Sequence, residues 1–366
     1  MSDLYPLLMV PAFDPRPWGT LDLTQIYSNY RFQEKIGESW LTGDKCKVAN
    51  GPLAGKPLAE LCTQFGAAIT GESAADPRQF PLLLKFLFPE EKLSVQVHPD
   101  DDAARKAGLP NGKTECWYVA HAKPGAQIGL GLKAGVTRAQ FEQSIKENRA
   151  EELLNWINVF AGEMIYVAGG TVHTLGGGSI IVETQQQSDT TYRLYDYGRP
   201  RELHLKDGLA VIKEKVPSGK TLRPAPSTLN GSRNQKSPLI AAPKFVVEMF
   251  ELKEPQKFET RDASGKTSVQ ILVATEGCGM VEVDGKDPVM LAKEKSTIMM
   301  LGGEPLGERF IWWNFVSSHK ERIEQAKADW KDGRIILPPT DNHEFIPLPT
   351  DNSKPAGTGP PPPALS

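Results

Sequence analysis

The sequence has few cysteines, no long apolar run and little net charge, and each of these shortages argues against a class of protein. The four cysteines, Cys46, Cys62, Cys116 and Cys278, are scattered without a C-x-x-C pair, so we expect free thiols of a reducing compartment and no disulfide framework. No stretch approaches the roughly 20 consecutive apolar residues that span a bilayer. The N-terminal apolar run is short and interrupted by Pro6. These features predict a cytoplasmic protein without a signal peptide or a membrane-spanning helix.

The charges are nearly balanced, with 42 Lys and Arg against 45 Asp and Glu and a net charge of -3. Nucleic acid is therefore not an expected partner, because phosphate backbones are bound by clustered basic residues. Hydrophobic residues make up 39% of the chain, which allows an ordinary packed core. The 366 residues leave room for two domains, or for one large β protein with additions.

Strand patterns dominate the chain, and helices are few. The first 50 residues or so predict irregular structure, because Pro11, Pro15 and Pro17 break any helix. Residues 56–68 predict a short helix with Pro57 in its first turn, and the apolar run 81–88 predicts a buried strand. Further predicted elements are one or two helices within 137–158 with a break at Asn148, and strands at 245–252, 268–274, 279–283, 296–301 and 309–315.

The stretch from residue 93 to residue 118 contains the side chains best suited to bind a metal. Alternation along a strand places Gln96 and His98 on one face. A second short run places Lys113 and Glu115 on one face, so two neighbouring strands would bring all four side chains into one cavity. An imidazole, a carboxylate and an amide oxygen are reasonable ligands for a divalent metal. These three donors leave at least one coordination position to be filled by another residue.

A polar strand face that contacts only water is the simpler interpretation of Gln96 and His98 taken alone. A glycine turn before a later histidine changes this weighting. It fits G-x(5)-[P/A]-x-G-x-x-H and resembles the second sequence signature of cupin barrels, with alanine in place of the usual proline. The matching positions are Gly162, Ala168, Gly170 and His173. Gln96-Val-His98, followed by Glu115 after a longer gap, resembles an altered first cupin signature.

Three motifs in order resemble type I mannose-6-phosphate isomerases. They are S-V-Q-V-H-P-D-D at 94–101, G-K-T-E-C-W-Y at 112–118, and the segment 183–197. The similarity runs from about residue 17 to about residue 210, and more weakly to about 318. The family consists of zinc-dependent cupin enzymes. The resemblance therefore implies a mainly β protein with two cupin jelly-roll barrels, a small helical insertion, a C-terminal helix and one zinc ion per chain.

Carried over residue by residue, the resemblance implies Arg193 as the active-site arginine and Lys113 as a basic catalytic neighbour. The implied zinc ligands are Gln96, His98, Glu115 and His173. The implied reaction interconverts mannose 6-phosphate and fructose 6-phosphate, which moves a proton between C1 and C2 through an enediolate. Its negative oxygen needs a fixed positive partner, and Arg193 can bind either that oxygen or the phosphate through a forked contact.

The base that moves the proton stays open, with Asp189 and Glu183 as two possible carboxylates. Glu38 and Trp40 resemble an early Gly-Glu-x-Trp segment of the family, although packing explains them equally well. His121 and His204 match no motif, so we expect structural roles for them. We also leave the phosphate-binding residues open.

A second resemblance concerns the C-terminal end. Residues 321–334 and 345–349 resemble the end of pirin-like proteins, another two-barrel cupin group, whose N-terminal barrel has an iron site. This keeps two alternatives open: a metal-binding cupin oxygenase or pirin-like protein, and an inactive sugar-binding relative. Iron with oxygen uptake would favour the former, and ligand binding without turnover at saturating zinc would favour the latter.

These patterns predict a division of the chain into a catalytic unit, a connection, a second barrel and a tail. The predicted parts are an N-terminal catalytic cupin domain at 1–215 with a helical insertion near 137–158, a linker at 216–240, a degenerate C-terminal cupin domain at 241–318, a terminal helix and extension at 319–353, and a disordered Pro-rich tail at 354–366. The expected partner is a phosphorylated hexose, with no nucleic acid and no membrane. We expect the chain to be a monomer or a homodimer.

Overall fold

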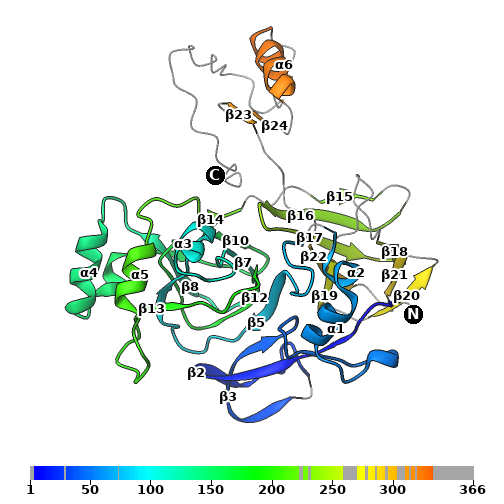
Figure 1. Cartoon of the computed structure of the whole chain (residues 1–366), viewed down its shortest axis with the longest axis horizontal. Coiled ribbons are helices and arrows are strands. Elements are labelled where there is room, and N and C mark those ends of the chain that lie inside the picture. Colours follow the sequence, from blue (N-terminus) through cyan, green and yellow to red (C-terminus); the bar gives the residue numbers. More distant parts are fainter. Residues whose placement is uncertain are drawn as a thin grey trace.

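Two β units make up most of the described chain (Figure 1). The computed structural model describes residues 4–28, 30–72, 74–221, 226–229, 232–258, 270–276, 279–284, 287–292, 296–302, 310–312, 315–317 and 320–332. The prediction of a mainly β protein with few helices and a C-terminal helix is confirmed. The predicted tail and Cys278 lie outside the described residues, whereas Cys46, Cys62 and Cys116 are free and buried.

The first unit contains a seven-stranded and a five-stranded sheet. The larger one has the order β14-β10-β7-β12-β5-β3-β2. Its strands are β14 (Gly219–Lys220), β10 (Met164–Val167), β7 (Glu115–Ala122), β12 (Ser179–Gln186), β5 (Leu82–Leu87), β3 (Arg31–Trp40) and β2 (Ala12–Asp22). Every residue of β5 is buried, as the apolar run predicts. A separate two-stranded ladder joins β1 (Met9–Val10) to β4 (Lys47–Val48).

The smaller sheet has the order β13-β6-β11-β8-β9. Its strands are β13 (Tyr192–Tyr195), β6 (Val95–Val97), β11 (His173–Leu175), β8 (Gln127–Leu132) and β9 (Leu154–Asn158). One buried cluster joins Trp117 and Ile165 of the larger sheet to Ile128 and Leu175 of the smaller one. The two sheets therefore pack face to face over a shared core, and the space between them can also enclose a site.

The expectation of irregular structure near the N-terminus is wrong for β2 and β3, which form an antiparallel pair. Pro15 and Pro17 lie within β2. They are tolerated because β2 is the edge strand of its sheet, where a missing N–H breaks no ladder on the outer side. The pairing register of β2 shifts at Pro15, as expected where a strand contains proline.

The helical insertion is shorter than predicted. Helix α4 (Arg138–Lys146) begins at a capping box on Thr137, and the 3-10 turn η2 (Ala150–Leu153) follows it. The break at Asn148 is confirmed, since this residue has a φ of 56°. The prediction of helix up to residue 158 is wrong, because β9 pairs there with β8 at the edge of the smaller sheet.

The remaining helices are short, and some are close to their predicted positions. The helix predicted at 56–68 forms as α1 (Leu58–Phe65) and α2 (Ala67–Thr70), divided at Gly66. The others are η1 (Gly51–Leu53), α3 (Asp101–Lys106), α5 (Leu205–Val211) and α6 (Lys320–Lys331). Figure 1 shows α4 and α5 side by side at the edge of the first unit. No helix among the described residues is long and apolar enough to cross a membrane.

The second unit contains a five-stranded sheet, β15-β16-β17-β22-β19, and a three-stranded sheet, β18-β21-β20. Their strands are β15 (Ser227–Thr228), β16 (Gln235–Ala242), β17 (Phe245–Leu252), β22 (Ser296–Gly302), β19 (Gln270–Glu276), β18 (Gln256–Lys257), β21 (Asp287–Ala292) and β20 (Gly279–Asp284). A further pair joins β23 (Phe310–Trp312) to β24 (Phe315–Ser317), which α6 contacts. Strands occur at all five predicted positions in this half.

The two units share one buried cluster. Phe245 and Val247 of β17 belong to the same cluster as Leu84 and Phe86 of β5. The stretch expected to be a linker contributes β14 to the first unit and the start of β16 to the second. The second unit is therefore packed on the outer face of the larger sheet of the first. The division into five parts stays a prediction.

Candidate metal centre

Three strands of the smaller sheet place predicted site residues in one row. His173 of β11 pairs with Gln96 of β6, and Gln96 pairs on its other side with Arg193 of β13. Directly opposed residues project from the same face of a sheet, so the three side chains are neighbours. Glu115 comes from β7 in the larger sheet. The site residues therefore meet across two facing sheets, and not on two neighbouring strands as the sequence pattern suggested.

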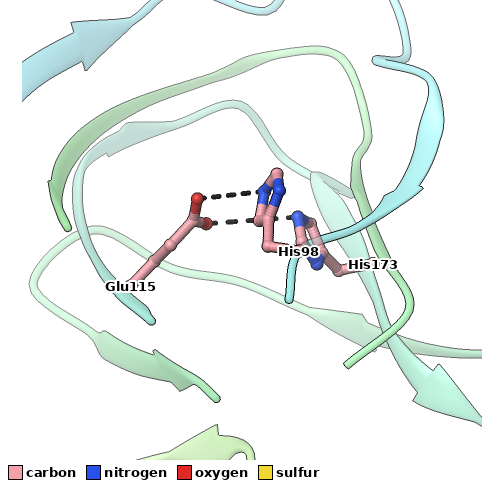
Figure 2. A group of neighbouring side chains, drawn as sticks. All are labelled: His98, Glu115 and His173. Carbon is pink, nitrogen blue, oxygen red and sulfur yellow. Dashed lines mark ion pairs between the residues drawn. The ribbon is translucent and has the colours of Figure 1, made fainter. Parts of the chain in front are cut away.

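His98, Glu115 and His173 form a compact buried group (Figure 2). Their candidate ligand atoms all lie within 4.8 Å of one another. His98 Nε2 is 3.1 Å from Glu115 Oε1, and His173 Nε2 is 4.0 Å from Glu115 Oε2. Each side chain is about 1% exposed. Two imidazole nitrogens and a carboxylate that converge in a dry site form a donor set suited to a divalent metal.

Backbone carbonyls orient both imidazoles. The Nδ1 atom of His98 lies 2.9 Å from the carbonyl oxygen of Thr190, and that of His173 lies 2.9 Å from the carbonyl oxygen of Thr171. Since a carbonyl only accepts, each Nδ1 must carry the proton and donate. Each Nε2 then presents a lone pair to the centre of the group, which is the arrangement of metal-ligating histidines.

The charge states also suit metal binding. Burial and then the Lys113 ammonium lower the pKa of His98 to about 3, and burial lowers the pKa of His173. Burial alone would raise the pKa of Glu115, but Lys113, His98 and His173 together hold that pKa well below its usual range. The structure therefore offers two neutral imidazoles and one carboxylate, the forms in which these side chains bind metal.

Gln96 lies beside the His98, Glu115 and His173 side chains, but it turns its amide nitrogen, and not its oxygen, toward them. Gln96 Nε2 is 3.2 Å from His173 Nε2, and Gln96 Oε1 accepts a hydrogen bond from Ser94 Oγ at 3.3 Å. Turning the amide over about its last bond would exchange the two atoms and bring the oxygen to the centre. Gln96 is therefore placed to act as a ligand after this rotation.

Lys113 contacts two members of the group. Its Nζ atom is 2.9 Å from Glu115 Oε1 and 3.2 Å from His98 Nε2. Lys113 itself is buried, and it lies in the loop before β7. A buried ammonium next to a buried carboxylate offsets part of the cost of keeping both charges out of water.

A second buried network extends from the group along the larger sheet. The indole Nε1 of Trp117 donates to Glu115 Oε2 at 3.1 Å and to Glu183 Oε2 at 3.0 Å. Glu183 is paired with Lys85 at 3.1 Å, and Lys85 with Glu38 at 3.2 Å. Burial, and then the charge of Glu115, raise the pKa of Glu183. A continuous chain of charge-assisted contacts thus joins the candidate ligand Glu115 to β3.

A cavity of about 480 Å³ opens beside the metal group. Of the predicted site residues, Gln96, Lys113 and Arg193 line it, as do the two candidate bases, Glu183 and Asp189. The lining also includes residues that sequence reasoning did not select or did not assign to the site, namely Arg16, Trp18, Glu38, Lys85 and Arg201. The motifs gave no signal for Arg16 or Lys85, because their approach to the cavity depends on long-range strand pairing. Arg201 lies in the segment between β13 and α5, where no motif was recognised.

The two histidines that match no motif lie elsewhere. His121 is half-buried on β7, where it pairs with Ile180. His204 precedes α5, and its Nδ1 accepts a hydrogen bond from the backbone N–H of Arg193 at 3.3 Å. His204 therefore supports the backbone that presents Arg193. Neither histidine belongs to the described metal group or to the lining of the cavity.

Facing β sheets that enclose a buried His-Glu-His group suited to a divalent metal, beside a charged cavity, are typical of cupin enzymes. A model described as the phosphomannose isomerase type I catalytic domain matches residues 13–111. The mannose-6-phosphate isomerase of Streptococcus mutans is 35% identical over 264 residues, which cover 69% of this chain and 81% of that protein. The crystal structure of the mannose 6-phosphate isomerase from Bacillus subtilis superposes with a TM-score of 0.68 and 27% identity, covering 81% of this chain and 99% of that one.

The chain belongs to the mannose-6-phosphate isomerase family. It is an isomerase with the cupin fold that the resemblance of its motifs implies. The predictions of family, fold class and enzyme class are confirmed.

The second unit has a different relationship. A model described as the pirin C-terminal cupin domain matches residues 253–336. A pirin-like protein of Caulobacter vibrioides is 56% identical over 87 residues, which cover 24% of this chain and 30% of that protein. The pirin-like similarity is therefore wider than the C-terminal stretch that suggested it. It does not include the metal group of the first unit, so it does not favour a pirin-like activity at that site.

Proposed function

We propose that the protein interconverts mannose 6-phosphate and fructose 6-phosphate in the cavity beside His98, Glu115 and His173. The observation that supports this most strongly is the buried His-Glu-His group next to a cavity lined by Arg193 and Lys113, in a chain of this family. A phosphorylated hexose is accordingly the proposed substrate. The scattered thiols still favour a cytoplasmic location, and the expectation of a monomer or homodimer is unchanged.

The proposed cofactor is one zinc ion per chain, with Gln96, His98, Glu115 and His173 as its ligands. Two nitrogen donors and a carboxylate fit zinc better than calcium or magnesium, which prefer all-oxygen sites. When bound, the ion would supply Lewis-acid stabilisation for negative charge that develops on a sugar oxygen.

Arg193 and Lys113 are the proposed catalytic residues. The proton transfer between C1 and C2 creates negative charge on the oxygens of an enediolate. Two cations held in place beside the cavity stabilise such charge more than mobile ions in water would, because they need not reorganise as the reaction proceeds. Lys113 is fixed by Glu115, and the backbone of Arg193 is fixed between β6 and His204.

The candidates for the proton-transfer base are Glu183 and Asp189, the cavity carboxylates that remain when Glu38 is set aside. Glu38 is a poor base: although burial alone would raise its pKa, the nearby cations, Lys85 first, and the hydrogen bond from Trp40 together lower it to about 2. A carboxylate with so low a pKa has little tendency to take a proton from carbon near neutral pH. Glu183→Gln and Asp189→Asn are isosteric tests, and we expect the variant that removes the base to lose about 100-fold or more in kcat.

The proposed reaction is tested by a coupled assay with mannose 6-phosphate, run with and without a chelator, on the wild type and on Arg193→Ala. We expect turnover that the chelator abolishes and zinc restores, and a large loss of kcat in the variant. Full turnover in Arg193→Ala would contradict the role of that residue. Oxygen uptake with bound iron, or sugar binding without turnover at saturating zinc, would favour one of the two alternative functions instead.

A further inference from the structure

Lys113, one of the two proposed catalytic residues, lies in a buried segment without regular secondary structure. Residues 112–114 directly precede β7 and are all buried. Their N–H groups are not part of a strand ladder, so they need acceptors from elsewhere in the chain. Because a buried N–H without an acceptor costs free energy, the acceptors determine where this segment lies.

The N–H groups on either side of Lys113 both depend on the side chain of Asp101. The N–H of Gly112 donates to Asp101 Oδ1 at 3.0 Å, and the N–H of Thr114 donates to Gln186 Oε1 at 3.0 Å. Gln186 Nε2 in turn donates to the same Oδ1 atom of Asp101 at 2.9 Å, which leaves the amide oxygen for Thr114. One carboxylate oxygen therefore fixes the backbone before Lys113 directly, and the backbone after it through Gln186.

The two stretches of backbone approach each other very closely at this point. A Cβ atom added at Gly112 would lie 2.5 Å from the carbonyl carbon of Asp100 and 2.5 Å from the nitrogen of Asp101. The N–H of Lys113 also donates to the carbonyl of Pro99 at 2.9 Å. Packing as close as this transmits strain, so a movement of Asp101 would move the backbone of Lys113 as well.

The other oxygen of Asp101 contacts the second unit. Asp101 Oδ2 forms an ion pair with Nζ of Lys244, which lies in the two-residue turn between β16 and β17. The next residue, Phe245, is fully buried in the cluster that the two units share, so this turn is anchored. Burial alone would raise the pKa of Asp101, but hydrogen bonds from Lys244 and Gln186 lower it. The side chain is therefore a carboxylate at neutral pH.

We propose that Asp101 is a positioning residue for Lys113, and that Lys244 of the second unit holds Asp101 in turn. This inference rests on the proposed function, in which the ammonium of Lys113 stabilises the enediolate. The second unit contributes no described residue to the lining of the cavity, so its effect on the reaction would pass through this contact. A misplacement of about 1 Å can cost about 100-fold in rate. We expect a smaller loss, because Lys113 keeps its direct contacts to Glu115 and His98.

The first test compares Asp101→Ala with Asp102→Ala in steady-state kinetics with mannose 6-phosphate. We expect kcat to fall about tenfold in Asp101→Ala and KM to change by less than about twofold, because Lys113 acts on charge that develops in the transition state. Asp102 is a matched control: it is the next carboxylate along α3, but it is 75% exposed and pairs with Arg105. Its variant should keep kcat within about twofold of the wild type.

Two further variants separate the charge of Asp101 from its hydrogen bonds. Asp101→Asn retains an oxygen for the two hydrogen bonds of Oδ1 but loses the attraction to Lys244, whose side chain is 39% exposed. Asp101→Asn and Lys244→Ala should each lower kcat by only about two- to fivefold, since partly exposed ion pairs contribute little. Lys236→Ala is the control, because Lys236 pairs with Glu248 inside the second unit at 2.6 Å. A wild-type kcat in both variants would overturn the contribution of the second unit.

A double variant distinguishes positioning from a general structural role. Lys113→Met removes the ammonium through which Asp101 is proposed to act. In that background Asp101→Ala should lower kcat by less than about twofold, because effects that share one residue do not add. A residue that only stabilises the fold would lower kcat by the same factor in both backgrounds, and that result would overturn the positioning role.

Hydrogen–deuterium exchange of the zinc-loaded protein tests the same contacts without turnover. In Asp101→Ala we expect the amides of Gly112 and Thr114 to exchange about tenfold faster or more, and those of β5 to stay unchanged. If the alanine variant fails to fold, Asp101→Asn and Lys244→Ala take its place with a smaller increase at the same amides. Unchanged exchange at both amides would overturn the proposal.

The two proposals fail separately in these experiments. A wild type that does not isomerise mannose 6-phosphate would overturn the proposed function, and faster exchange in Asp101→Ala would still show that Asp101 holds the segment of Lys113. A wild type that isomerises mannose 6-phosphate, with Asp101→Ala unchanged in kcat and in exchange, would keep the function and overturn the positioning role.

Discussion

Replacing Glu38 by glutamine should destabilise the protein by an amount that depends on pH in a defined way. Glu38 is buried, and its carboxylate contacts Lys85, Arg16 and the indole N–H of Trp40, the last at 2.7 Å. The Glu38→Gln variant keeps the shape of the side chain but removes its charge. Lys85 and Arg16 then each lose one of their two carboxylates.

The expected magnitude follows from the pKa of Glu38. Burial alone would raise it, yet the nearby cations lower it from 4.5 to about 2. This corresponds to about 3 kcal/mol, at 1.36 kcal/mol for each factor of ten in proton affinity. Because the folded-state pKa is the lower one, the stabilisation is fully present above about pH 4.5 and is lost as the pH falls through about 2.

The assay is urea unfolding of the wild type and Glu38→Gln at pH 7 and pH 3. We expect the free energies of unfolding to differ by about 3 kcal/mol at pH 7 and by about half of that at pH 3. Glu34→Gln is a control, since Glu34 is exposed on the same strand, and it should change the stability by less than about 0.5 kcal/mol. A difference below about 1 kcal/mol at pH 7, or one that does not shrink at pH 3, would refute the reasoning.

Substitutions at three further positions test other parts of the structure. Trp117→Phe removes the N–H shared by Glu115 and Glu183 and should weaken metal affinity about tenfold or more in a chelator competition; unchanged affinity would argue against this support. Asn148→Gly should be tolerated, whereas Asn148→Ala should cost about 1 kcal/mol in urea unfolding, because the φ of 56° disfavours a side chain; equal stabilities would contradict this. Thr137→Ala should cost about 1 kcal/mol through loss of the capping box at α4, and a change below about 0.3 kcal/mol would count against a role for the cap.

Sequence patterns predicted the candidate ligands because these lie in local motifs. The alternation around Gln96 and His98 can be read from the sequence alone, whereas the glycine turn before His173 was recognised by its resemblance to a cupin signature. The same patterns could not show that Glu115 faces these residues from the opposite sheet, since that depends on how β6 and β7 pack. Local periodicity specifies a face of a strand, but not the partner of that face.

The buried ion-pair network and the residues that line the cavity could not be predicted from the sequence either, because they too depend on which strands pair. Lys85 interrupts an apolar run, and only the pairing of β5 with β12 and β3 places Glu183 and Glu38 beside it. The residues of β9 were assigned to a helix because their apolar spacing fits either state, and the edge of the smaller sheet decided the outcome. The prolines of β2 predicted irregular structure, but a strand forms there because an edge strand tolerates proline.

The measurement that most directly tests the account is the metal content of the purified protein, determined together with its isomerase turnover. We expect one zinc ion per chain in the wild type. His98→Ala and His173→Ala should lose zinc and turnover together while the fold, followed by circular dichroism, is retained. Full turnover in zinc-free protein, or a wild-type zinc content in both variants, would contradict the claim that His98, Glu115 and His173 hold the catalytic metal.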